Sequence, residues 1–254
     1  MPANRKVLML PGDGIGPEVM RQVRRVIDWM DKRRAVRFDV TEDLVGGAAL
    51  DKHGVPVTEE TMAKAMSTDA VLFGSVGGPK WDVLPFEKKP ERGLLRLRKD
   101  LGLFANLRPA TVFPELAEAS TLKPEVVSGL DIMILRELTG GVYFGEPRGI
   151  TTLPDGTKKG VDTQVYTTPE IERIARVAFE LARKTPKKHL TSATKSNGIA
   201  ITMPYWDERV EAMAKNYPDI KWDKYHIDIL SALFVLRPDK FNVVVASNLL
   251  DRKS

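Results

Sequence analysis

Three arginines stand on separate predicted elements of this chain. Arg98 belongs to a stretch with helical spacing, and Arg108 lies in a short extended segment before a proline. Arg136 directly follows an apolar run. Singly, an arginine most often forms a salt bridge. If the three converge, a dianionic ligand is the best explanation, because a guanidinium binds a carboxylate through two parallel hydrogen bonds.

The stretch 132–149 could present polar chemistry from a rigid strand. Its apolar start, Ile132–Leu135, predicts a buried strand that ends at Arg136 and Glu137. A glycine-broken turn then brings Tyr143 back beside this charged pair. A charged pair at a strand's end with a tyrosine returned beside it is one common way to present polar chemistry from a rigid scaffold. Spacing alone favours the other interpretation, an ordinary β-hairpin whose arginine and tyrosine are partly exposed.

Two further polar residues follow predicted strands. Lys195 stands among small polar residues after a short strand at His189-Leu190. Asp228 closes a strand-like segment and directly precedes a predicted helix, Ile229–Leu236. Strand ends of this kind are where α/β proteins place polar chemistry.

Two glycine-rich loops also follow predicted strands. The strand Lys6–Pro11 leads through a glycine turn into a helix over Glu18–Met30. This is not the dinucleotide fingerprint, because its third glycine comes one residue too early. The strand Ala70–Phe73 leads into a loop that contains Gly77 and Gly78. Each loop could bind a ligand or be a plain turn.

The remaining patterns complete an α/β fold. On the predicted helix that carries Arg98, Leu94 lies on the face of that arginine, and Glu91 lies on the face of Leu95. The other predicted elements are strands at Val36–Thr41 and Asn242–Ala246, helices at Thr58–Met66 (with Thr58 as N-cap) and Pro169–Lys184, and an exposed hairpin turn at Asp155-Gly156-Thr157.

Composition narrows the function. The 254 residues are 43% hydrophobic, enough for one large or two modest domains. No cysteine is present, which excludes a disulfide framework and suits a reducing compartment such as the cytoplasm. No apolar run approaches a membrane span. The net charge of +5 comes from 39 basic residues interspersed with 34 acidic ones, so we expect a solvated surface or anionic small molecules and no nucleic acid.

Six long motifs resemble one enzyme family, the β-hydroxyacid oxidative decarboxylases that include 3-isopropylmalate, isocitrate, D-malate and tartrate dehydrogenases. The chain up to about Lys184 is most similar to the isopropylmalate branch, and the part from about residue 190 on is more similar to the D-malate and tartrate branch. The motifs are PGDGIGPE (11–18), GSVGGPKWD (74–82), GLLRLRK (93–99), FANLRP (104–109), RELTGGVYFGEPRG (136–149) and TKSN (194–197).

The resemblance implies a two-domain α/β fold that is unrelated to the Rossmann fold. Residues 1–98 would be the N-terminal part of a cofactor-side first domain, which is left incomplete. Residues 99–250 would form the central dimerisation and substrate domain, and 251–254 an atypical tail. A homodimer with active sites shared between subunits is implied, as are the cofactors NAD and Mg²⁺ or Mn²⁺.

The resemblance also implies a role for each matching residue. Tyr143 and Lys195 would be catalytic: Tyr143 as the acid that protonates the enol, and Lys195, from the partner subunit, as the group that takes the hydroxyl proton. Asp228 would bind metal and substrate. The other substrate residues would be Arg98, Arg108, Arg136, Leu94 and Leu95, and the cofactor residues Ile15, Gly77, Gly78, Glu91 and Asn197.

The implied reaction is the NAD-dependent oxidative decarboxylation of a 2-hydroxy dicarboxylate. Leu94 and Leu95 favour 3-isopropylmalate, whereas Gly198, where that branch usually has an apolar residue, favours the smaller D-malate or tartrate. Arg252 stands where the family has a further metal aspartate. We therefore expect a C-terminally truncated member of doubtful activity. The rival interpretation is a non-catalytic dimerising remnant.

Overall fold

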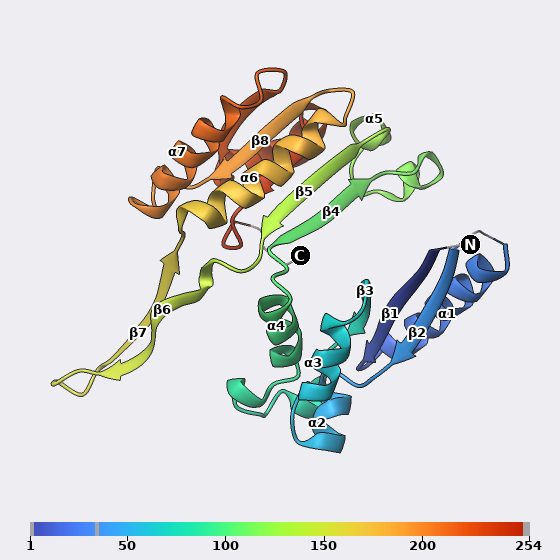
Figure 1. Cartoon of the computed structure of the whole chain (residues 1–254). Helices are drawn as coiled ribbons and strands as arrows, with labels where there is room; N and C mark the ends of the chain where they lie inside the picture. Colours follow the sequence, from blue (N-terminus) through green and yellow to red (C-terminus); the bar gives the residue numbers. More distant parts are fainter. Residues whose placement is uncertain (1–2, 34–35, 251–254) are drawn as a thin grey trace. The chain divides into compact units, whose positions relative to one another are not determined.

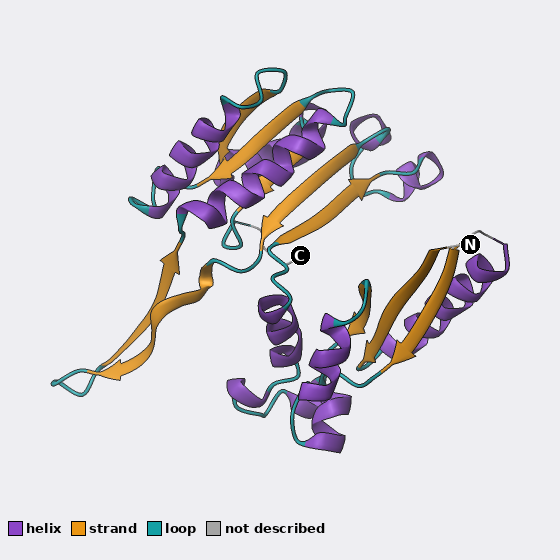
Figure 2. Cartoon of the chain, viewed as in Figure 1, coloured by secondary structure: helices purple, strands orange, loops and turns teal. Residues whose placement is uncertain are grey.

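A computed structural model describes residues 3–33 and 36–250 and divides the chain into two compact units, 1–102 and 103–254. Figure 1 shows the course of the chain and Figure 2 its helices and strands. No helix in the described ranges has the length and apolar character needed to cross a membrane.

The first unit contains a three-stranded parallel sheet in the order β2-β1-β3. The strand, glycine turn and helix predicted at the start of the chain are confirmed as β1 and α1. Its strands and helices, with three-residue 3-10 turns as η1 and η2, are β1 (Ala3–Gly12), α1 (Gly16–Arg33), β2 (Val36–Glu42), α2 (Gly47–His53), α3 (Glu59–Met66), β3 (Ala70–Ser75), η1 (Pro79–Trp81), η2 (Phe86–Lys88) and α4 (Glu91–Asp100).

The central strand β1 is buried on both faces. Leu8 and Leu10 belong to one apolar cluster with Leu97 of α4, and Met9 belongs to a second cluster with Met20 of α1. Successive strand residues point to opposite faces, so an unbroken apolar run covers both. The sequence KVLML therefore places helices on the two sides of this sheet.

Thr58 caps α3 as predicted. Its hydroxyl accepts a hydrogen bond from the backbone N–H of Thr61 at 3.1 Å. We expect Thr58→Ala to lower the free energy of unfolding by about 1 kcal/mol, because one N–H of the first turn loses its acceptor. Urea unfolding would measure this. Thr58→Ser keeps the hydroxyl and is the control; equal losses in both variants would contradict the cap.

The second unit is built on a five-stranded sheet in the order β4-β5-β10-β8-β9, in which only β4 runs antiparallel to its neighbour. The last strand in sequence, β10, is central in space. The elements of this unit are β4 (Ala105–Thr111), η3 (Pro114–Ala119), α5 (Pro124–Val127), β5 (Asp131–Glu137), β6 (Gly141–Thr152), β7 (Lys158–Val165), α6 (Thr168–Arg183), β8 (His189–Thr194), α7 (Thr202–Ala214), β9 (Lys221–His226), α8 (Ile227–Leu236), η4 (Pro238–Lys240) and β10 (Val243–Ala246).

Helices cover both faces of this sheet (Figure 1). Val243 and Val245 of β10 pack in the cluster that contains the buried residues of α6 and α7. Val244, between them, packs in the other cluster with Leu230 of α8. The predicted apolar face of α6 is confirmed, since its six residues Ile171, Ile174, Ala175, Ala178, Phe179 and Ala182 are all buried.

The strands β6 and β7 form a separate two-stranded antiparallel ribbon that carries no helix (Figure 2). The predicted turn at Asp155-Gly156-Thr157 joins them, and Asp155 accepts hydrogen bonds from the backbone N–H and the hydroxyl of Thr157. The alternative of a hairpin within 132–149 is wrong, because β6 pairs with β7 and not with β5.

Asp223 on β9 makes the second unit sensitive to acid. It accepts hydrogen bonds from His189 Nε2 at 3.0 Å and from the hydroxyl of Thr191 at 2.7 Å. Burial opposes ionisation of this carboxyl, but the bonds from His189 and Thr191, with the charges of His189 and Lys221, outweigh burial and lower its pKa.

The lowered pKa of Asp223 stabilises the folded state above the unfolded pKa of about 4. This contribution is lost as the pH falls through the lower folded pKa, because the unfolded chain then binds the proton first. We expect Asp223→Asn to flatten the decline of unfolding free energy in this acidic window, as measured by urea unfolding at several pH values. Parallel pH curves for the two proteins would contradict the assignment.

Candidate functional site

The carboxyl ends of four parallel strands, β5, β10, β8 and β9, meet at one edge of the second unit's sheet. Arg136 stands near the end of β5 and Lys195 directly after β8, while Asp228 lies in the first turn of α8, after β9. Neighbouring strands are about 4.8 Å apart, so β5 and β8, with β10 between them, are about 10 Å apart. This edge therefore holds two separate sets of polar side chains. One is Arg136 with its neighbours, and the other is the pair of Lys195 and Asp228.

Arg108 and Arg136 lie on the same face of neighbouring strands. In the antiparallel pair β4–β5, Asn106 is directly opposite Arg136, and Arg108 is two residues from Asn106. Residues two apart in a strand share a face, and diagonal neighbours of this kind are about 7–8 Å apart. The Nε of Arg108 donates to Asn106 Oδ1 at 2.5 Å. Two of the three predicted arginines are thus brought together.

Tyr143 lies beside Arg136, as the sequence predicted. The Arg136 guanidinium carbon is 5.6 Å from the centre of the Tyr143 ring, within the range of a cation–π contact. Arg136 is buried, whereas Tyr143 is 50% exposed. A cation that anchors an anionic ligand and a phenol that can donate a proton therefore stand next to each other at the strand's end.

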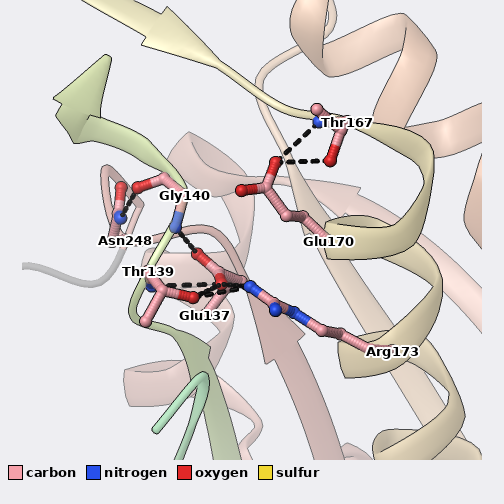
Figure 3. A network of polar contacts seen from close by, with 7 residues as sticks. All are labelled: Glu137, Thr139, Gly140, Thr167, Glu170, Arg173 and Asn248. Carbon is pink, nitrogen blue, oxygen red and sulfur yellow. Dashed lines mark hydrogen bonds and ion pairs between the residues drawn. The ribbon is translucent and has the colours of Figure 1, made fainter. Parts of the chain in front are cut away.

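The turn between β5 and β6 is organised by Glu137, a fully buried carboxylate (Figure 3). Glu137 accepts hydrogen bonds from the backbone N–H and hydroxyl of Thr139 and from the N–H of Gly140. Arg173 of α6 also donates to it, at 3.3 Å, and to the Thr139 hydroxyl at 2.6 Å. Asn248, after β10, donates to the carbonyl of Gly140 at 2.7 Å. The turn is therefore bound to two other elements of its unit.

Lys195 and Asp228 form an ion pair in which the ammonium donates to the carboxylate. The parallel pairing of β8 with β9, whose last register pair is Thr194 with His226, places both side chains at the same edge. Asp228 was predicted to lie just before a helix, but it is the second residue of α8 itself. Asn197 is exposed in the turn after Lys195.

A metal ion needs more ligands than this pair supplies. Across residues 3–33 and 36–250, no group of three or more His, Asp or Glu side chains is placed to hold a metal ion. Arg252 lies outside the described residues. Among the described residues, Asp228 alone does not make up a complete metal site.

In the first unit, the buried carboxylate of Asp13 joins the two glycine-rich loops. Its Oδ2 accepts the N–H groups of Gly47 at 2.7 Å and Gly77 at 2.9 Å, and its Oδ1 accepts the N–H of Ala48 at 2.7 Å. Its own N–H donates to the carbonyl of Ser75. One side chain thus fixes the loop after β1, the start of α2 and the loop after β3.

Four of the five predicted cofactor residues, all except Asn197, lie around this junction. Gly77 has a φ of 99°, and a Cβ on it would come 2.7 Å from Glu91 Oε1. Glu91 begins α4 and is exposed, and Ile15, in the loop after β1, is also exposed. Gly78 follows Gly77 directly, and a Cβ on it would come 3.4 Å from the Trp81 ring.

The predicted apolar and cationic residues of the first unit share the helix α4. Leu94, Leu95 and Arg98 are all half-buried, and Leu97 faces the core. The structure confirms that Leu94 and Arg98 are one helical turn apart on one face. The remaining predicted site residues belong to the second unit.

The roles of Asp13, Glu137 and Arg173 were not predicted from the sequence. The carboxylates of Asp13 and Glu137 accept hydrogen bonds from backbone N–H groups of loops. Almost any residue type can supply such a donor, so the sequence does not reveal these bonds. The available signal was an acidic residue placed among glycines or at the end of an apolar strand.

Comparison with known proteins assigns the family. Residues 6–251 match the isocitrate/isopropylmalate dehydrogenase family. The chain is 60% identical over 247 residues to the 3-isopropylmalate dehydrogenase of Paramagnetospirillum magneticum, covering 97% of this chain and 67% of that protein. The chain belongs to the isocitrate/isopropylmalate dehydrogenase family.

Other members of the family agree with this assignment. The 3-isopropylmalate dehydrogenase of Rhodospirillum rubrum is 57% identical, covering 98% of this chain and 67% of that protein. The crystal structure of isocitrate dehydrogenase from Methylococcus capsulatus superposes with a TM-score of 0.82 at 30% identity, covering 97% of this chain and 67% of that one. The chain thus spans about two thirds of the length of these family members, and its predicted α/β family fold is confirmed.

Proposed function

We propose that this protein catalyses the NAD-dependent oxidative decarboxylation of 3-isopropylmalate to 2-oxoisocaproate, a step of leucine biosynthesis. The observation that carries the proposal is the contact of Arg136 with Tyr143, with Arg108 on the same sheet face. It occurs in a chain that is 57–60% identical to enzymes named 3-isopropylmalate dehydrogenase. Paired guanidiniums suit a dicarboxylate, and the adjacent phenol supplies a proton donor.

The residues of this chain divide the work as follows. Arg98, Arg108 and Arg136 bind the two carboxylates, and Leu94 and Leu95 contact the isopropyl group. The amine form of Lys195 takes the proton of the C2 hydroxyl. NAD⁺, when bound, would supply the acceptor for the hydride that leaves C2. The bond between C3 and its carboxylate then breaks, which releases CO₂ and leaves an enolate. Tyr143 donates a proton to C3 to complete the product.

Residues of the first unit would hold the cofactor. The backbone of Gly77 and Gly78 would approach it closely, Glu91 would face the nicotinamide side, and Ile15 would contact it from the neighbouring loop. Asn197 would also contact the cofactor. These five positions agree with a nucleotide held mainly by backbone and loop residues.

We also propose a cytoplasmic homodimer in which Lys195 and Asp228 serve the partner's site. Support comes from α8, an apolar helix of which Ile229, Val235 and Leu236 are 49%, 51% and 66% exposed. Exposed apolar residues gathered on one helix are typical of an interface. The absence of cysteine suits the reducing cytoplasm.

The test is turnover by the purified 254-residue chain with NAD⁺, Mn²⁺ and either 3-isopropylmalate or D-malate. NADH absorbance and release of 2-oxoisocaproate are the measurements, and calorimetric titration with each ligand accompanies them. A higher kcat/KM for 3-isopropylmalate supports the proposal. A preference for D-malate overturns the substrate, and binding without NADH formation overturns the activity of this chain.

Subunit sharing has its own test. Tyr143→Phe and Lys195→Ala subunits, refolded together, should regain turnover that neither homodimer shows, because one mixed site would contain both native residues. Mixtures as inactive as the separate variants would contradict a site shared between subunits.

A further inference from the structure

The side chain of Glu137 is 0% exposed. Burying a carboxylate costs free energy unless other groups stabilise its charge. Glu137 is stabilised by four hydrogen-bond donors: the N–H and hydroxyl of Thr139, the N–H of Gly140, and the guanidinium of Arg173. Three of the four donors belong to the turn between β5 and β6. The carboxylate therefore acts mainly on this turn and not on the strand that carries it.

Arg136 does not need Glu137 to hold its place. Its backbone lies between two strands, in register with Asn106 of β4 on one side and Ala246 of β10 on the other. Ladder hydrogen bonds on both sides fix a strand residue firmly. Arg136 would thus keep its position if the turn after it moved.

Tyr143 is held differently. It lies in β6 between Gly141 and Gly145, the stretch where the register of the β6–β7 pair shifts. The regular ladder is interrupted there, so the preceding turn largely determines where the tyrosine lies. Figure 3 shows that turn enclosed by Glu137 and Arg173 on one side and Asn248 on the other.

Close packing restricts the conformation of the turn between β5 and β6. Gly141 has a φ of 70°, and a Cβ on it would come 2.3 Å from Asn248 Oδ1 and 2.7 Å from the Tyr166 hydroxyl. Burial first, and then the Glu137 charge, raise the pKa of Tyr166 well above its usual value, so this phenol stays neutral against the turn. The turn has little room to adopt another conformation while Glu137 is in place.

We propose that Glu137 is a positioning residue that sets Tyr143 against Arg136 by binding the backbone of the turn between them. This inference rests on the proposed function, in which Tyr143 protonates the enol. It predicts that loss of the carboxylate affects the proton-donating step more than substrate binding, because the arginine is held by the sheet and the tyrosine by the turn.

The test compares Glu137→Gln with Glu170→Gln. Glu170 is a matched control, since it also accepts a backbone N–H and a hydroxyl, both from Thr167, but it does not contact the turn (Figure 3). We expect Glu137→Gln to lower kcat about tenfold to a hundredfold, the effect of a displacement of roughly 1 Å, with KM changed by less than about threefold. Glu170→Gln should leave both constants near the wild-type values.

A second measurement does not depend on turnover. Amide hydrogen exchange of residues 138–145 should become about tenfold faster in Glu137→Gln and stay unchanged in Glu170→Gln, because the Thr139 and Gly140 amides lose their charged acceptor. If Glu137→Gln does not fold, Arg173→Lys keeps the carboxylate but removes the guanidinium nitrogen that donates to it and to Thr139, and should show the same changes to a smaller extent.

The outcomes separate the inference from the function on which it rests. If the wild-type chain forms no NADH, the proposed turnover fails and hydrogen exchange alone decides the role of Glu137. Wild-type exchange at 138–145, or a kcat equal to that of Glu170→Gln, would overturn the inference. A rise in KM with an unchanged kcat would overturn the inference as well, because it would place the effect on substrate binding by Arg136.

Discussion

Replacing Asp13 with alanine is expected to lower the unfolding free energy of the first unit by about 3–5 kcal/mol, because three backbone N–H groups would lose a buried, charged acceptor. Two of these donors, Gly47 and Gly77, are 34 and 64 residues from Asp13 in sequence, so no local interaction replaces them. Hydrogen exchange, read separately over residues 3–33 and 36–102, would locate the loss within this unit.

Asp51→Ala is the matched control for Asp13. Asp51 also joins α2 to the segment after β3, through Lys80 at 2.6 Å and Trp81 Nε1 at 3.2 Å, but at the surface. Exposed pairs contribute little to stability, so this variant should unfold much like the wild type. Equal stability of the Asp13 and Asp51 variants would show that the buried junction is not what holds the loops.

Replacing Tyr143 with phenylalanine is expected to lower kcat about 10²–10⁴-fold, the usual contribution of a general acid, with little change in thermal unfolding. Phenylalanine keeps the ring that lies 5.6 Å from Arg136 and removes only the hydroxyl. Because the ring is half-exposed, removing the hydroxyl leaves no buried group without a partner.

Tyr217→Phe controls for the loss of a phenol elsewhere in the same unit. The Tyr217 hydroxyl donates to Glu180 at 2.9 Å, far along the sequence from the candidate site. This variant should keep the wild-type kcat. A Tyr143→Phe enzyme with wild-type kcat would remove Tyr143 from the proposed chemistry, whatever its effect on KM.

Local patterns predicted the parts of the fold whose cause is local. The helix α6 was predicted from six apolar residues at helical spacing, and all six are buried. The helix α7 was not predicted, although Met203, Trp206, Val210 and Met213 carry the same kind of spacing and are buried. Pro204 argues against a helix when the sequence is read alone, but it lies in the first turn of α7, where a helix tolerates proline.

In the candidate site, too, only the features with a local cause were predicted from the sequence. The sequence placed Tyr143 beside Arg136, because a glycine turn between them is a local feature. The predicted hairpin turn at Asp155-Gly156-Thr157 indicated a local pairing around it, but the sequence did not show that this pairing extends to Gly141 and Val165. Nor could it show which backbone groups Asp13 and Glu137 bind, since those partners are brought together only by the folded loops.

The order of strands in the second unit has a consequence for its synthesis. The middle strand, β10, is the last of the five to leave the ribosome, and β5 and β8 both pair with it. Until residues 243–246 emerge, β5 with β4 and β8 with β9 can form only two partial sheets, each with an unpaired apolar edge. Nascent chains halted before this strand should therefore be more prone to aggregate and to bind chaperones than chains halted after it.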